Sequence, residues 1–169
     1  MNMERNTIRK WFWVWDFEKE ERWLNQMAME GWVLVDVGWA NYTFERCEPG
    51  DYIIRLQMHK PDEAYLSFLE EMGAEYIGRV VQWIYLRRKA EEGPFELFSD
   101  TQSKIEHLNW IARTLLPLGI ANLLFGVVNS INTNPLGALN VVVATLIMYG
   151  LGRIHGKIES LEKDRDLQE

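Results

Sequence analysis

Hydrophobic and polar positions divide the chain into two parts. Up to about residue 90, short stretches with a period of two, typical of strands, are interleaved with stretches of helical period. From Ile111 to Ile131, and again from Leu136 to Leu151, nearly every residue is apolar or small. The pattern predicts a mixed α and β domain followed by two long apolar helices.

The first part contains an internal repeat. A shift of 42 residues places Trp23 on Tyr65 and Gly31 on Gly73. The two copies cover about residues 10–47 and 51–89. Each copy predicts the same order of strand, helix, strand and strand.

Turn and cap residues give the bounds of the predicted elements. Asp16 is a favourable helix N-cap, and Pro61-Asp62-Glu63 is a favourable helix start. Gly31 and Gly73 are typical residues at helix ends. The expected strands are Trp11–Trp15, Trp32–Val37, Asn41–Arg46, Tyr52–Met58, Glu75–Arg79 and Val81–Arg87.

The segment Glu48-Pro49-Gly50-Asp51 joins the two copies. Proline followed by glycine is typical of a type II turn, so we expect Asn41–Arg46 and Tyr52–Met58 to pair as antiparallel strands. The predicted fold class is α+β. A duplicated β-α-β-β unit would form one mainly antiparallel, ferredoxin-like sheet with both helices on one face.

The two apolar runs are long enough for a membrane-spanning helical hairpin. A spanning helix needs about 20 mostly apolar residues. Ile111–Ile131 provides 21 residues, and Gly137–Ile154 provides 18, with the turn Asn132–Pro135 between them. Two soluble helices with facing apolar sides are the alternative. Neither run has the charged stripe of a soluble helix, so we expect a transmembrane hairpin.

The placement of charge gives the hairpin an orientation. Residues 1–109 hold 13 Lys and Arg against 20 Asp and Glu, and no charged residue lies between Arg113 and Arg153. Lys and Arg flank the hairpin and are absent from its turn, which predicts that both termini are cytoplasmic. The expected parts are a cytoplasmic domain (1–92), a linker and juxtamembrane helix (93–109), the hairpin (110–154) and a charged cytoplasmic tail (155–169).

Small and amide residues recur along the two spans. They are Gly119, Asn122, Gly126 and Asn129 in the first span, and Asn140 and Ala144 in the second. Their spacing places them on one face of each helix, where small residues allow close packing and amides bond across the contact. A polar pathway through the membrane, or contact between copies of the chain, are the alternatives.

Tryptophan is concentrated in the first part, where seven of the eight lie before residue 84. In the expected strands, Trp11, Trp13 and Trp15 share one face, and Trp83 shares a face with Tyr85. Aromatic side chains in strands are most often core. The alternative is a sheet face that no helix covers, on which these five residues bind a partner or ligand, or contact the bilayer.

Motifs of known chemistry are missing from the sequence. It has no phosphate loop, dinucleotide fingerprint or nucleophile elbow, so we predict no catalytic residue, metal site or cofactor. We expect His59, His107 and His155 to be solvated or interfacial, and the acidic run from Asp16 to Glu21 to be the exposed first turn of a helix. Cys47 alone excludes an intramolecular disulfide. The acidic balance excludes a basic nucleic-acid-binding surface.

The sequence resembles a bacterial family known as domain of unknown function 2812. The stretches that carry the resemblance are Trp11–Met27, Gly31-Trp32, Tyr42–Tyr52, Gly73–Tyr76 and Phe95–Asp100. The resemblance implies a membrane protein of a Gram-positive bacterium, located in the cell membrane. Members are often encoded beside a PadR-type transcriptional regulator, which implies a regulatory or envelope-stress role. The family has no catalytic residues that could be carried over.

These observations favour a membrane-anchored interaction or sensing module that is not an enzyme. Its expected partners are the lipid bilayer and either another protein or a second copy of the chain, with no nucleic acid. The alternative function is that of an accessory subunit of a transporter or envelope complex, which acts through the transmembrane helices.

Overall fold

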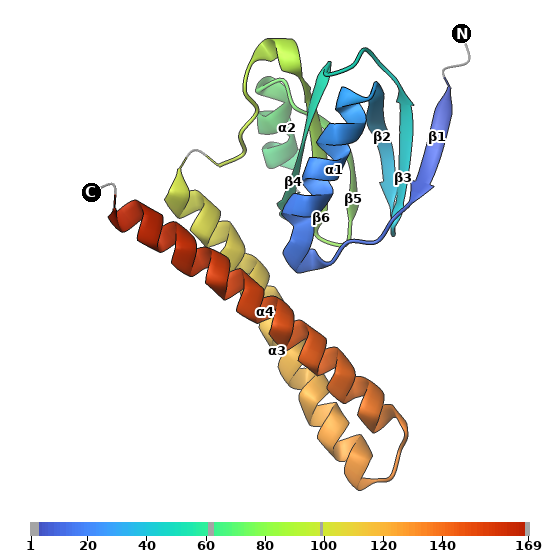
Figure 1. Cartoon of the computed structure of the whole chain (residues 1–169), viewed down its shortest axis with the longest axis vertical. Helices are drawn as coiled ribbons and strands as arrows, with labels where there is room; N and C mark the ends of the chain where they lie inside the picture. Colours follow the sequence, from blue (N-terminus) through green and yellow to red (C-terminus); the bar gives the residue numbers. More distant parts are fainter. Residues whose placement is uncertain (1–3, 61–62, 99, 168–169) are drawn as a thin grey trace. The chain divides into compact units, whose positions relative to one another are not determined.

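The computed structural model describes residues 4–60, 63–98 and 100–167 (Figure 1). It divides into two compact units, with the boundary between Leu97 and Phe98. The elements of the first unit are β1 (Arg5–Arg9), the 3-10 helix η1 (Val14–Asp16), α1 (Phe17–Met29), β2 (Trp32–Gly38), β3 (Asn41–Arg46), β4 (Tyr52–Met58), α2 (Glu63–Glu71), β5 (Glu75–Val80), β6 (Trp83–Lys89) and the 3-10 helix η2 (Ala90–Glu92). The second unit consists of α3 (Thr101–Ile131) and α4 (Leu136–Asp166).

The six strands form two antiparallel sheets in the orders β1-β3-β2 and β4-β6-β5. Both halves of the first unit therefore have the same element order and the same strand order. The helices are followed by Gly31 and Gly73, whose φ values of 83° and 78° are favourable only for glycine. The predicted α+β class with a helical hairpin is confirmed.

The prediction that β3 pairs with β4 is wrong, although the turn between them has the expected geometry. The N–H of Asp51 donates to the carbonyl of Glu48 at 3.1 Å, and Gly50 has a φ of 79°. However, β3 pairs with β1 on one side and with β2 on the other, so it has no free edge. The turn instead connects two separate three-stranded sheets.

The two helices lie on opposite faces of the β4-β6-β5 sheet, which corrects the expectation of one sheet with both helices on one face. Tyr85 of β6 belongs to the hydrophobic cluster that contains Leu24 of α1. Ile84 and Leu86, which point to the other face of the same strand, belong to the cluster that contains Leu69 of α2. The helix α1 packs against β2 of one sheet and β4 of the other (Figure 1). The two sheets also contact each other directly, through β2 and β5.

The expected strand at Trp11–Trp15 is absent, and the first strand is β1 at Arg5–Arg9. The sequence pattern missed β1 because its side chains are mostly exposed and polar, which an edge strand tolerates. The aromatic segment after it turns into η1, where the N–H of Asp16 donates to the carbonyl of Trp13 at 2.8 Å. The strand predicted from strand propensity alone therefore begins six residues after the start of β1.

Each helix of the second unit has 31 residues, which gives a length of about 46 Å. Asp100 is the N-cap of α3, and its side chain accepts from the N–H of Ser103 at 2.7 Å. Pro117 lies inside α3. Both helices are long and apolar enough to cross a membrane. In the most apolar 18-residue stretch of each helix, only 22% (α3) and 28% (α4) is buried.

Candidate functional site: an exposed tryptophan cluster

The five residues expected to share an aromatic face do not lie together on one face. Trp11 and Trp13 are 53% and 42% exposed, whereas Trp15 and Tyr85 are buried. Trp83 is half-buried and contacts Phe17 at 5.0 Å between ring centroids. Of these five residues, the two exposed ones, Trp11 and Trp13, come from the connection between β1 and η1 rather than from a strand.

The tryptophan cluster consists of Trp11, Trp13, Trp15 and Trp39. The rings of Trp13 and Trp15 stack at 5.0 Å with an angle of 7° between their planes. Trp11 contacts the edge of Trp13 at 5.8 Å and lies 5.5 Å from Trp39. Trp39, in the β2–β3 turn, is 61% exposed. Trp39 is not among the residues predicted from the sequence, although a large apolar side chain between two strands was an available signal.

The tryptophans are exposed because the segment before α1 alternates between outward and inward side chains. Phe12 packs inward, with its ring 5.5 Å from that of Trp23 and 6.3 Å from that of Tyr42. The N–H of Lys10 donates to the carbonyl of Ala40 at 3.0 Å, which holds the segment beside the β2–β3 turn. The neighbours Trp11 and Trp13 are consequently directed outward.

The face of the β1-β3-β2 sheet opposite α1 is polar, so it is not the uncovered aromatic face considered above. The Thr7 and Thr43 hydroxyls lie 3.2 Å apart on this face, and Arg5 pairs with Glu45 at 2.7 Å. The aromatic residues of β3 instead point toward α1, where Tyr42 and Phe44 are buried.

A buried carboxyl joins α1 to both sheets. The hydroxyls of Tyr42 on β3 and Tyr85 on β6 both donate to Glu20 Oε1, at 2.7 and 2.5 Å. Burial raises the pKa of Glu20 above its ordinary value, and the two hydrogen bonds oppose that shift. Glu20 therefore departs from the expected exposed acidic turn.

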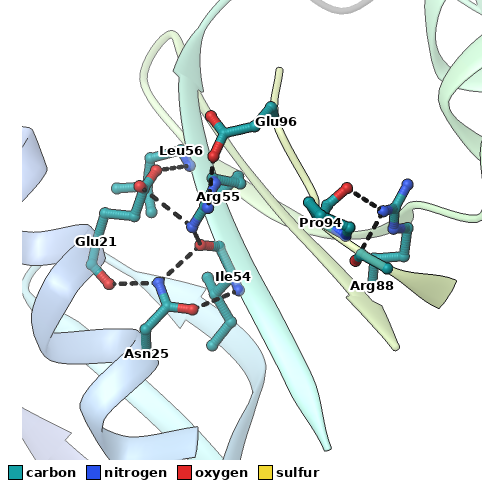
Figure 2. A network of polar contacts seen from close by, with 9 residues as sticks. Glu21, Asn25, Ile54, Arg55, Leu56, Arg88, Pro94 and Glu96 are labelled. Atoms are coloured by element: carbon teal, nitrogen blue, oxygen red, sulfur yellow. Dashed lines mark hydrogen bonds and ion pairs between the residues drawn. The ribbon is translucent and has the colours of Figure 1, made fainter. Parts of the chain in front are cut away.

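The next carboxyl of α1 belongs to a polar network on the outer edge of β4 (Figure 2). Glu21 Oε2 accepts from the N–H of Leu56 at 2.9 Å, and Arg55 lies 3.5 Å from the other oxygen. Asn25 accepts from the N–H of Ile54 at 2.9 Å and donates to its carbonyl at 2.8 Å. Burial raises the pKa of Glu21, while the hydrogen bond from Leu56 opposes the shift. These side chains take the place of a neighbouring strand.

Two arginines fix the segment after β6 to the first unit, as Figure 2 shows. Arg88 donates to the carbonyls of Gly93 and Pro94 at 3.0 and 2.5 Å. Arg55 donates to the Glu96 carboxylate at 3.3 Å. Phe95 is only 2% exposed and belongs to the cluster of α2 and β6. This segment is therefore part of the domain core, beyond the boundary expected at residue 92.

The small residues expected to pack the spans lie at the contact between α3 and α4. A side chain at Gly119 would meet Ile147 at 3.0 Å, and one at Gly126 would meet Val141 at 2.8 Å. Ala144 is 3% exposed. The amides of Asn122, Asn129 and Asn140 are partly exposed. That of Asn122 donates to the carbonyl of Leu118 in its own helix at 2.9 Å.

Among the described residues, no group of three His, Cys, Asp or Glu could hold a metal ion. Burial, followed by the charge of Asp51, raises the pKa of Cys47, which lowers its thiolate fraction. His107 is buried and its ring lies 4.8 Å from that of Phe98, so it is not solvated, and the expected alternative of an interfacial position stays a prediction. The ring of His59 stacks on Tyr65 at 3.9 Å.

A family model described as Protein of unknown function (DUF2812) matches residues 16–120. The match covers most of the first unit and about two thirds of α3. No curated protein and no solved structure matches the chain.

Proposed function

We propose that this chain, which belongs to the DUF2812 family of proteins of unknown function, is a membrane-anchored interaction or sensing module. The observation that carries the proposal is the apolar outer surface of the hairpin. Leu124, Phe125 and Leu139 are 61%, 63% and 58% exposed. Such a surface is unfavourable in water and matches the hydrocarbon core of a bilayer.

The first unit is the proposed interaction module. It has its own hydrophobic clusters. The exposed side chains of the tryptophan cluster are not part of them, so they are available for contact with a partner. Exposed indoles are enriched where proteins contact partners or membrane surfaces. Asn122 bonds to its own helix backbone, so we favour the interaction module over a transporter subunit that acts through the spans. The link to PadR-type regulators and contact with a second copy stay predictions.

We also propose that the two halves of the first unit are copies of an internal repeat. The 42-residue shift that relates Gly31 to Gly73 also relates the extra residues of two strand bulges, Val35 and Ile77. Bulges in equivalent positions of β2 and β5 support common descent of the halves, since a bulge is a specific feature of a strand.

The orientation of the hairpin tests the proposal in cells. Cysteines replace Asn134 in the turn and Glu169 at the chain end, each in a Cys47→Ser background. Because Lys and Arg flank the hairpin on the side of the termini, we expect an impermeant maleimide to label intact cells at position 134 only. Labelling at position 169 only would reverse the orientation. Recovery of the protein in the soluble fraction would overturn membrane anchoring.

A further inference from the structure

We infer that the tryptophan cluster binds the lipid headgroup region of the membrane in which the hairpin is anchored. This inference deepens the proposed function and rests on it. Three of the four cluster residues, Trp11, Trp13 and Trp39, are between 42% and 61% exposed. Indole combines a large apolar ring with an N–H donor, a combination that favours the boundary between water and hydrocarbon.

The cluster lies at the end of the first unit where strands of both sheets turn (Figure 1). Trp39 is in the β2–β3 turn, and Val81 is in the β5–β6 turn. The contact between Phe17 and Trp83 joins the start of α1 to the start of β6 at this same end. Apolar side chains from both turns thus point into solvent at one end of the domain.

Val81 strengthens the case for an apolar contact surface. It is 70% exposed and has a φ of 57°, which a β-branched residue rarely adopts. An exposed valine in this conformation contributes little to the core and stores backbone strain. Contact with an apolar surface outside the domain would account for an exposed apolar side chain at this turn.

Basic residues accompany the tryptophans. The backbone N–H of Lys10 donates to Ala40 in the β2–β3 turn, and the Lys10 ammonium lies over the rings of Phe12 and Trp23, 5.2 and 4.4 Å from their centroids. Lys60 follows His59, whose N–H donates to the carbonyl of Gln82 in the other turn at 2.9 Å. Arg79 lies two residues before Val81 and is exposed. Cations in these positions can contact anionic lipid headgroups.

Carboxylates partly offset these cations, whereas the opposite end of the domain is acidic. Asp36 and Glu63 are exposed near the tryptophan end. Asp16 and Glu18 also lie there, at the start of α1, where Lys19 pairs with Asp16 at 3.1 Å, so that end is close to neutral. The opposite end, where α2 and η2 finish, carries four exposed carboxylates. They belong to Glu70, Glu71, Glu91 and Glu92. An anionic membrane surface would repel the acidic end and so favour approach of the tryptophan end.

The chain itself keeps the first unit close to a membrane. Only residues 98–100 lie between Leu97 and α3. The apolar run of α3 begins at Ile111, so its first ten residues span about 15 Å outside that run. Tethering at this distance gives the domain a high effective concentration at the bilayer surface. A lipid surface is therefore the occupant that the observations favour over a free protein.

The test uses the full-length protein, reconstituted in vesicles of phosphatidylethanolamine and phosphatidylglycerol. An environment-sensitive fluorophore is attached to Val81→Cys, and in a matched control to Glu91→Cys at the opposite end, each with Cys47→Ser. Some vesicles contain a lipid with a nitroxide on its headgroup. We expect the nitroxide to quench about half of the emission at position 81 and little at position 91. Trp11→Ser combined with Trp39→Ser should remove the difference, because it deletes exposed indoles without touching the core.

Alkaline carbonate extraction of the same vesicles distinguishes failure of the proposed membrane anchoring from failure of the headgroup contact. If the protein resists extraction but both labels stay unquenched, anchoring holds and the headgroup contact is wrong. Equal quenching at both positions also overturns the inference, since it shows no preferred end. Shielding of position 81 in native membranes but not in pure lipid would assign the cluster to a protein partner instead. If carbonate extracts the protein, the proposed anchoring fails and the inference fails with it.

Discussion

Glu20 lies where α1 meets both sheets, and its burial costs free energy that two hydrogen bonds partly offset. The carboxyl connects three elements because one oxygen accepts from tyrosines on β3 and on β6. Burial raises its pKa, so folding favours the protonated form. Its contribution to stability is therefore largest at low pH and declines as pH rises through the raised, folded-state pKa.

Replacement of Glu20 tests this pH dependence. In Glu20→Gln the amide oxygen still accepts from both tyrosines, but no charge is buried. We expect the free energy of unfolding of the variant to rise relative to wild type as pH increases above the ordinary carboxyl pKa of 4.5. Urea unfolding of the detergent-solubilised chain, followed by tryptophan emission, measures it.

Glu20→Ala provides the contrast to the conservative variant. It leaves two buried tyrosine hydroxyls without their acceptor, which should lower the free energy of unfolding by about 2–4 kcal/mol. A Gln variant whose difference from wild type is the same at pH 5 and pH 8 would contradict the assigned role of burial.

The helical period could have identified Glu20 before the structure, whereas Trp39 gave a weaker signal. Glu20 precedes Leu24 by four residues and Met27 by seven, so it shares the buried face of α1. The neighbouring acidic residues concealed this, since a run of carboxylates at a helix start is usually solvated. Exposure of Trp39 depends on the contact with Trp11 from a distant segment, which spacing along the chain cannot give.

At the scale of elements, side chains of α1 form the hydrogen bonds to the edge of β4 that a neighbouring strand would otherwise form. Asn25 pairs with both backbone groups of Ile54, and Glu21 accepts from Leu56 (Figure 2). An uncovered strand edge would expose these groups to water and to other chains. This role of α1 was not predicted from the sequence, because the turn at Gly50 indicated β3 as the strand that pairs with this edge of β4.

Asn25→Ala should expose this edge. We expect faster amide hydrogen exchange at Ile54 and a loss of about 1–3 kcal/mol in the free energy of unfolding, because buried backbone groups lose their partners. Gln26→Ala is the matched control, since the Gln26 side chain donates to Glu30 on the exposed face of the same helix. Equal exchange at Ile54 in both variants would show that water replaces Asn25 without cost.

The hairpin depends on glycine where its helices are closest. Alanine at Gly126 and Gly137 would place a Cβ 2.8 Å from a Val141 methyl and 2.5 Å from the Ser130 hydroxyl. At Gly152 and Gly156 it would meet nothing within 4 Å. We expect the first pair of substitutions to destabilise the hairpin by about 1–3 kcal/mol and the second pair to leave it unchanged or more stable.

The stability of the hairpin can be measured by SDS titration, with excimer emission from two pyrene-labelled cysteines reporting whether the helices are in contact. The labels replace Gln102 and Arg165, whose side chains lie 3.0 Å apart at the open end of the hairpin. A lower SDS midpoint for the Gly152 and Gly156 variant than for the Gly126 and Gly137 variant would contradict the packing described here.

For the whole molecule, the class of the fold followed from the sequence and the arrangement of its sheets did not. Helix ends such as Gly31, and the apolar runs of α3 and α4, are set by local chemistry that the sequence displays. Strand pairing depends on which edges remain free after distant segments have packed. The polar strand β1 filled the edge of β3 that the turn at Gly50 had suggested for β4.

The extent of the independently folding domain is a further consequence of packing. A fragment that ends at residue 92, as the sequence suggested, lacks Phe95, which is 2% exposed in the core of α2 and β6. It also lacks the carbonyls of Gly93 and Pro94 to which Arg88 donates. Loss of a buried phenylalanine costs about 3–5 kcal/mol, which is a large part of the total stability of a domain of this size.

We therefore expect the fragment 1–97 to unfold in one cooperative thermal transition and the fragment 1–92 to be largely unfolded at the same temperature. Phe95→Ala in the longer fragment should reproduce most of the loss, whereas Glu96→Ala, which removes one exposed partner of Arg55, should have little effect. Differential scanning calorimetry of the four proteins measures this. If 1–92 is as stable as 1–97, the linker is not part of the domain core. The first unit would then end at η2, and the arginine contacts in Figure 2 would only orient the chain that leads to α3.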